Sequence, residues 1–130
     1  MTNITQAHIT KVATTMIPVS DQDQAIAFYT EKLGFEVRTD IAYGNGERWV
    51  EVGPASGETT IALTSMRPEA TEWQLGRMTG ISIHSGDIKA DHEALSAAGV
   101  DVDELSDFGP PVPPMFWFRD QDGNTLLVVG

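Results

Sequence analysis

The sequence predicts an α+β fold that is built from two copies of one strand–helix–strands unit. In the first copy an amphipathic helix ends at Gly34 and a strand follows; the second copy repeats this plan around Gly99. A further echo relates the strand after Gly57 to the strand after Gly123. Neither copy can bury its apolar face alone, so we expect the two copies to combine around a cavity.

The first copy is expected to contain one helix and four strands. Ser20 is a good N-cap, and Asp21 and Asp23 place carboxylates in the first turn, where they favour the helix dipole. Gly34 is the expected C-terminal stop. The predicted strands are rich in β-branched residues and are separated by glycine-containing turns: Ala13–Val19, Phe35–Ile41, Glu47–Val52 and Thr59–Ser65.

The second copy repeats the order of elements with two distinctive loops. Residues 109–114, Gly-Pro-Pro-Val-Pro-Pro, predict a stiff extended loop at the rim of the cavity. Residues 120–124 are typical of a tight turn and are interpreted as turn chemistry alone. The predicted helix is Asp87–Ala98, and the predicted strands are Gly80–His84, Val100–Leu105, Met115–Phe118 and Thr125–Val129.

Length and composition limit the class of protein. The 130 residues predict a single domain, 1–130, with one module at about 12–66, a linker at about 67–78 and a second module at about 79–130. No apolar run is long enough for a membrane span, and no signal peptide is evident, so we expect no membrane partner and a cytoplasmic protein. The absence of cysteine excludes disulfides and thiolate chemistry.

The net charge of −11 makes nucleic acid an unsuitable partner, because phosphate binding requires a basic face. A negative surface serves solubility, and it also attracts cationic ligands. Both interpretations remain open at this point.

Three segments carry a family resemblance. They are residues 18–21 (Pro-Val-Ser-Asp), residues 27–35 (Ala-Phe-Tyr, then Leu-Gly-Phe) and residues 118–124 (Phe-Arg-Asp-Gln-Asp-Gly-Asn). In these segments the chain resembles the vicinal oxygen chelate superfamily, which includes glyoxalase, bleomycin-resistance proteins and extradiol dioxygenases. The resemblance implies paired βαβββ modules that form a curved, half-open mixed sheet around a cavity. It also implies a homodimer.

Enzymes of this superfamily commonly hold a divalent metal with one side chain from the first and last strand of each module. Carried onto this sequence, those positions are Thr14, Ala62 (or Ile61 if the register slips by one), Ile81 and Leu127. Three are apolar, and a lone hydroxyl cannot hold an ion. We therefore expect no metal site and no cofactor. His84 lies three residues after Ile81, so strand alternation predicts that it points away from the cavity.

Strand alternation also predicts which side chains line the cavity, starting from the positions implied by the resemblance. Trp49 and Glu51 are expected to face inward because Val50 and Val52 fit the helix-covered face. An internal repeat with an offset of about 66 residues then turns Met115 and Trp117 inward as well. The predicted ligand-binding residues are Thr14, Met16, Trp49, Thr60, Ala62, Ile81, Met115, Trp117 and Leu127.

Each assignment has a plainer interpretation. Trp49 and Trp117 are also compatible with ordinary packing, and Glu51 with a position facing solvent. A half-buried carboxylate beside tryptophan faces suits a flat or cationic ligand. Without a partner, a buried Glu51 would have a raised pKa and could act as a general base.

Two functions follow from these residues. The first is a metal-independent binding protein that sequesters an aromatic or cationic small organic molecule in a cleft at a dimer interface. The alternative is a metal-independent isomerase, epimerase or lyase in which Glu51 transfers the proton. The two differ in what the change Glu51→Gln removes, ligand affinity or turnover.

Overall fold

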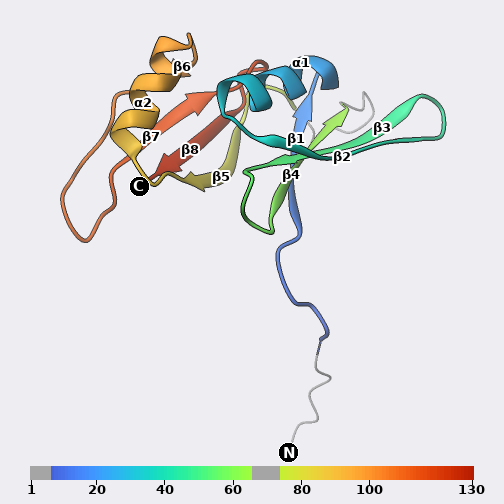
Figure 1. Ribbon diagram of the computed structural model, residues 1–130, viewed down its shortest axis with the longest axis horizontal. Coiled ribbons are helices and arrows are strands. Elements are labelled where there is room, and N and C mark those ends of the chain that lie inside the picture. Colours follow the sequence, from blue (N-terminus) through green and yellow to red (C-terminus); the bar gives the residue numbers. More distant parts are fainter. Residues whose placement is uncertain (1–6, 66–73) are drawn as a thin grey trace, which may run out of the picture.

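Two separate four-stranded sheets form the body of the computed structural model (Figure 1), which describes residues 7–65 and 74–130. The first sheet has the strand order β1-β4-β3-β2 and the second has β5-β8-β7-β6. In each sheet the first and last strands of the unit lie parallel to each other and the remaining pairs are antiparallel. The predicted α+β class with paired modules and open, mixed sheets is confirmed.

The elements follow the predicted order. The helices are α1 (Gln22–Ala27), continued by a π-helical turn (Phe28–Lys32), and α2 (Ile88–Ala97). The strands are β1 Thr14–Val19, β2 Glu36–Tyr43, β3 Glu47–Gly53, β4 Thr60–Ser65, β5 Met78–His84, β6 Asp101–Val102, β7 Met115–Arg119 and β8 Thr125–Val129. Among the described residues neither helix is long and apolar enough to cross a membrane.

Helix α1 begins one residue later than the sequence predicted. Asp21, with an extended backbone, is the N-cap, and its side chain accepts a 3.1 Å hydrogen bond from the Gln24 amide. The predicted cap, Ser20, instead donates from its hydroxyl to Asp122 at 2.6 Å. Both residues are good caps by type, and the contact with Asp122 is set by the tertiary structure.

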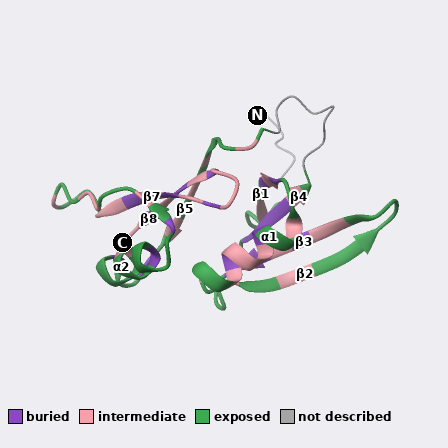
Figure 2. Ribbon diagram, turned by 90° about the horizontal axis from the view of Figure 1, so that it is seen from above, coloured by how far each residue is buried: buried purple, intermediate pink, exposed green. Residues whose placement is uncertain are grey.

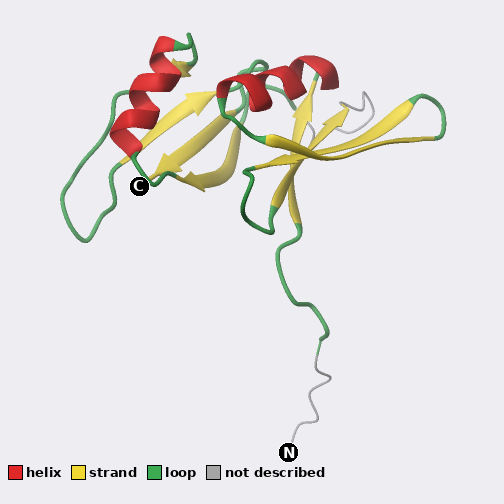
Figure 3. Cartoon of the chain, in the orientation of Figure 1, coloured by secondary structure: helices red, strands yellow, loops and turns green. Residues whose placement is uncertain are grey.

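Both helices lie on one side of the two sheets (Figure 3). Alternate residues of the strands point toward them and are buried, as period-2 patterning requires. One hydrophobic cluster joins both sheets. Its buried strand residues are Ile17, Val19, Val50, Val52, Ile61, Leu63, Phe116, Phe118, Leu126 and Val128. Within the described ranges, the opposite face of each sheet carries no helix.

A buried polar group links the two sheets. The Tyr29 hydroxyl donates a 2.8 Å hydrogen bond to Asp120, and Asp120 also accepts hydrogen bonds from the amides of Asp122 and Asn124. The Asn124 side chain then donates to the Pro18 carbonyl at 3.0 Å. The turn at residues 120–124, interpreted from the sequence as turn chemistry alone, therefore also joins the modules.

Candidate functional site

The helix-free face of the first sheet carries Trp49 and Glu51. Their neighbours in β3, Val50 and Val52, are buried under α1, whereas Trp49 and Glu51 are half-buried on the other face. The register places Ala62 beside both Glu51 and Met16, so these three share that face. Thr14 and Thr60 pair with each other one step along the same face.

Glu51 is held in place by two donors. The Trp49 indole Nε1–H donates to Glu51 Oε2 at 2.7 Å, and the Thr60 hydroxyl donates to Oε1. These bonds, Thr60 first and Trp49 second, lower the pKa of Glu51 below its ordinary value, and partial desolvation opposes them less strongly. The condition for a raised pKa, a buried Glu51 without a partner, is therefore not met, because partners come from its own strand and from β4.

Three residues of β2 that were not predicted from the sequence also lie on this face. In the ladder between β2 and β3, Thr39 pairs with Glu51, Ile41 with Trp49, and Tyr43 with Glu47. Directly paired side chains project from the same face of a sheet. Their orientation can be predicted from the sequence, because strand alternation counted back from the hairpin turn assigns these residues to the face of Trp49.

The helix-free face of the second sheet carries Trp117. Trp117 pairs with Leu127, and Met115 pairs with Val129. Their neighbours Phe116 and Phe118 are fully buried, which leaves Met115 and Trp117 on the opposite face. Trp117 and Leu127 are half-buried there.

The position predicted for Ile81 is wrong. The register of β5 against β8 shifts between Met78 and Ser82, and Gly80, with a φ of 75°, lies in the shifted segment. Ser82 therefore pairs with Leu127, while Ile81 packs against the hydrophobic core. A register change of this kind exchanges the two faces of a strand.

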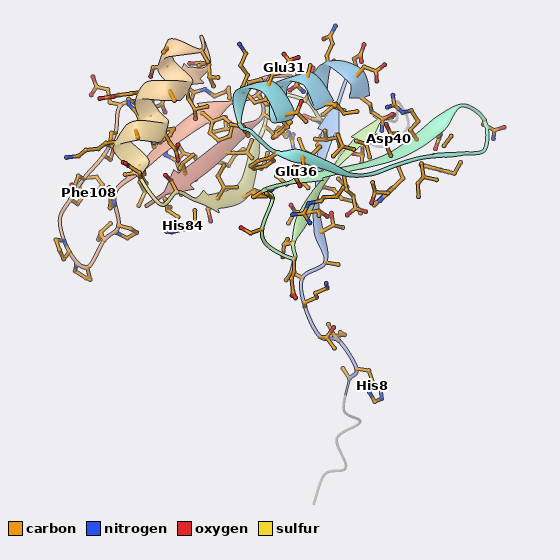
Figure 4. The ribbon with its side chains drawn as sticks, in the orientation of Figure 1. His8, Glu31, Glu36, Asp40, His84 and Phe108 are labelled. Atoms are coloured by element: carbon orange, nitrogen blue, oxygen red, sulfur yellow. The ribbon has the colours of Figure 1, made fainter. Side chains whose placement is uncertain are left out.

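The same shift moves His84 to the helix-free face. His84 pairs with Val129, which lies opposite Met115. Figure 4 shows its ring on the side of the sheet away from α2. Ser82 and His84, rather than Ile81 and Ile83, thus accompany Trp117.

Within one chain, the described residues of the Trp49 face and of the Trp117 face do not form one pocket. They belong to different sheets, and the Gly109–Pro114 loop lies at the opposite end of the molecule from the β2–β3 hairpin (Figure 1). This loop forms a small cavity of about 360 Å³ from its own prolines and Asp107. A cavity of about 880 Å³ between the sheets is lined by residues such as Phe35, Ile61 and Leu95, without Trp49, Glu51 or Trp117.

The four positions that the family resemblance assigns to metal ligands do not suit a divalent ion in this chain. The Thr14 hydroxyl already donates to the Thr60 carbonyl at 3.1 Å. Ala62 and Leu127 offer no donor, and the corrected register adds only the hydroxyl of Ser82. Among the described residues no three His, Asp or Glu side chains are grouped so that they could hold a metal.

Comparison with known proteins identifies the family. A model of the Glyoxalase/Bleomycin resistance protein/Dioxygenase superfamily matches residues 7–128. The chain belongs to this superfamily. The resemblance seen in the three sequence segments is therefore confirmed.

Individual relatives are similar along nearly their whole length. An uncharacterized protein of Bacillus subtilis (strain 168), YetH, is 31% identical, with 92% of this chain and 98% of that protein covered. The crystal structure of TnmS3, an antibiotic binding protein from Streptomyces sp. CB03234, is 31% identical with a TM-score of 0.82, and covers 95% of this chain and 98% of its own. A superfamily member from Sphaerobacter thermophilus DSM 20745 is 32% identical with a TM-score of 0.85 and the same coverage.

Proposed function

We propose that the chain is a metal-independent binding protein that sequesters an aromatic, cationic small organic molecule. The observation that carries the proposal is the Glu51 carboxylate, which Trp49 and Thr60 orient on the helix-free face of the first sheet. An aromatic face beside a fixed negative charge attracts planar cations through stacking, cation–π contact and direct ion pairing. The similarity to an antibiotic binding protein supports a small-molecule ligand.

Glu51 is poorly suited to the alternative role of general base. A carboxylate whose pKa is lowered by two hydrogen bonds is a weaker base than an ordinary glutamate. Proton abstraction next to a carbonyl also needs a group that stabilises the enolate. The two arginines in the strands of this sheet are engaged elsewhere: Arg48 projects toward Asp23 and Asp40, and Arg38 donates to the backbone carbonyls of Pro54 and Gly57. These points favour binding over an isomerase, epimerase or lyase.

The proposed ligand cleft is completed by a second copy of the chain. The Trp49 face and the Trp117 face belong to different sheets, and neither is covered by a helix of the described chain. In a homodimer the first sheet of one copy would face the second sheet of the other, as a self-complementary interface allows. The residues proposed to line the cleft are Thr14, Met16, Trp49, Glu51, Thr60, Ala62, Met115, Trp117 and Leu127, with Ser82 and His84 in place of Ile81.

Titration calorimetry with two planar three-ring probes tests this function. Proflavine is cationic at neutral pH, whereas acridone is neutral and of similar size. We expect Glu51→Gln to lower the affinity for proflavine at least about tenfold and to change the affinity for acridone little, because only the cation loses an ion pair. Trp117→Ala should lower the affinity for both probes. Equal affinity of the wild type and Glu51→Gln for proflavine would contradict the proposed role of the carboxylate.

Light scattering tests the composite cleft. We expect the dimer mass at micromolar concentration for the wild type, and the loss of probe binding under conditions in which the dimer dissociates. A monomer that binds proflavine with full affinity would show that one chain suffices. An enzyme would behave differently in one respect: Glu51→Gln would keep its ligand affinity and lose its turnover.

A further inference from the structure

The β2–β3 hairpin extends beyond the rest of its sheet. The ladder between β3 and β4 comprises the pairs Glu51–Ala62 and Val52–Ile61, whereas β2 and β3 remain paired as far as Tyr43 and Glu47. Figure 1 shows the hairpin projecting past β4, and Figure 2 shows that its outer end is exposed. The outer part of the hairpin thus has two usable faces.

One of these faces carries two exposed, largely apolar side chains. Ile41 pairs with Trp49, and Tyr43 follows two residues later on the same side. Ile41 is 59% exposed and Tyr43 is 46% exposed. Large apolar side chains that share an exposed face beside a candidate site form a candidate binding surface.

The other face fixes the base of the hairpin. Arg48 donates to Asp40 of the same hairpin and to Asp23 of α1, each at 2.8 Å. The Gln22 side chain adds a 3.0 Å hydrogen bond to the Arg48 carbonyl. The positions of Ile41 and Trp49 relative to Glu51 are therefore set before any ligand binds, which lowers the entropic cost of binding.

The dimensions of this face decide what it can bind. From Thr39, opposite Glu51, to Tyr43 the strand advances about 13 Å at ~3.3 Å per residue. A single ring held at Glu51 and Trp49 would leave Tyr43 uncovered, whereas a planar system of several fused rings spans the distance. Glu47, opposite Tyr43, places a second negative charge on this face, and this charge favours a cationic ligand.

We propose that Ile41 and Tyr43 form an outer subsite that selects extended, multi-ring planar cations over single-ring cations. This inference rests on the proposed binding function and specifies its ligand class. The occupant of the outer subsite is the distal part of the same ligand whose cationic part lies at Glu51. The continuity of the face from Glu51 to Tyr43 and its negative charge favour this occupant over a second copy of the chain.

The test compares proflavine with benzamidine, a single-ring cation, by titration calorimetry on the full chain. We expect Tyr43→Ala, alone or with Ile41→Ala, to lower the affinity for proflavine about 5- to 10-fold. The affinity for benzamidine should not change, because only the longer probe reaches the hairpin. Val37→Ala is the matched control: Val37 is 43% exposed on the same strand, but it pairs with the buried Val52 and so belongs to the other face. Proflavine affinity should not change in this control.

Three kinds of result would overturn the inference. The first is a wild type that binds benzamidine and proflavine equally well, or Tyr43→Ala with unchanged proflavine affinity. The second is a shift from dimer to monomer in light scattering for Tyr43→Ala, which would assign the face to a second copy. The third is a wild type that binds neither probe, which would overturn the proposed function together with the inference, whereas the first two leave that function standing.

Discussion

The hydroxyl of Tyr29 donates a 2.8 Å hydrogen bond to Asp120 Oδ2 across 91 positions of sequence, and both residues are buried where the two sheets meet. Tyr29 belongs to the Ala-Phe-Tyr segment and Asp120 to the Asp-Gln-Asp-Gly-Asn segment that carry the family resemblance. The polar side chains of these segments therefore hold the modules together rather than contacting the candidate ligand face.

Removal of this hydrogen bond should destabilise the fold. We expect Tyr29→Phe to lower the free energy of unfolding by about 1–2 kcal/mol, because the buried carboxylate loses one donor but keeps those from Asp122 and Asn124. Urea denaturation measures the change. The matched control is Tyr43→Phe, whose exposed hydroxyl should contribute less than about 0.5 kcal/mol. Equal effects of the two changes would contradict a structural role for the bond.

The same tyrosine should make stability sensitive to alkali. Burial, followed by the nearby charge of Asp120, raises the pKa of Tyr29 well above its ordinary value of 10.0. The neutral phenol therefore contributes its full stabilisation below the unfolded pKa, and this contribution is lost as the pH rises from 10 toward the folded value. We expect the unfolding free energy of the wild type to fall more steeply above pH 10 than that of Tyr29→Phe. Parallel curves would contradict this.

Glu51 should titrate on the acidic side of its ordinary value. The hydrogen bonds from Thr60 and Trp49 lower its folded pKa below 4.5, so its contribution to stability is present above pH 4.5 and is lost as the pH falls through the folded pKa. A carboxyl NMR titration should give a midpoint under 4.5. Binding of a permanent cation should accordingly be constant between pH 6 and pH 8. A midpoint well above 5 would revive the general-base role.

The glycine in the shifted segment of β5 should resist substitution. Gly80 has a φ of 75°, which an L-residue adopts at a cost of about 1–2 kcal/mol, although no atom lies within 4 Å of an added Cβ. We expect Gly80→Ala to lower the unfolding free energy by that amount. Gly86→Ala is the control, because Gly86 has equal space and no positive φ. A neutral Gly80→Ala would indicate that the register of β5 is not fixed by this residue.

The purified protein should retain no stoichiometric metal. Thr14, Ala62, Ser82 and Leu127 provide two hydroxyls and two alkyl groups where four good ligands would be needed. Elemental analysis after dialysis should find zinc, iron, manganese and nickel far below one per chain. About one tightly held ion per chain would contradict the proposal.

The arrangement of strands and helices could be predicted because local pattern and tertiary burial agree. Val50 and Val52 alternate with Trp49 and Glu51, and Phe116 and Phe118 alternate with Met115 and Trp117, so the buried face is evident from apolarity alone. The same alternation failed in β5. Nothing in the residues 78–84 reveals how Gly80 changes the register, because both Ile81 and Ser82 are acceptable on either face.

The electrostatics of the site could not be predicted for a different reason. The pKa of Glu51 depends on Thr60, which comes from another strand, and on the orientation of the Trp49 indole. Sequence alone indicated a carboxylate beside tryptophan but not the two donors that keep it ionised. The N-cap was predicted as Ser20 rather than Asp21 for a similar reason. Ser20 bonds to Asp122, which lies about 100 residues away in the chain.

The joint formed by Tyr29, Asp120 and Asn124 also bears on how such proteins diversify. It lies on the helix-covered side of the sheets, whereas Trp49, Glu51 and Trp117 lie on the helix-free side. Mutations can therefore accumulate on the helix-free face without weakening the joint between the modules. Sequences that share the joint can then differ completely in the ligands that they bind. A library randomised at Ile41, Tyr43 and Trp117 should remain largely folded, which makes the chain a practical scaffold for selecting new small-molecule receptors.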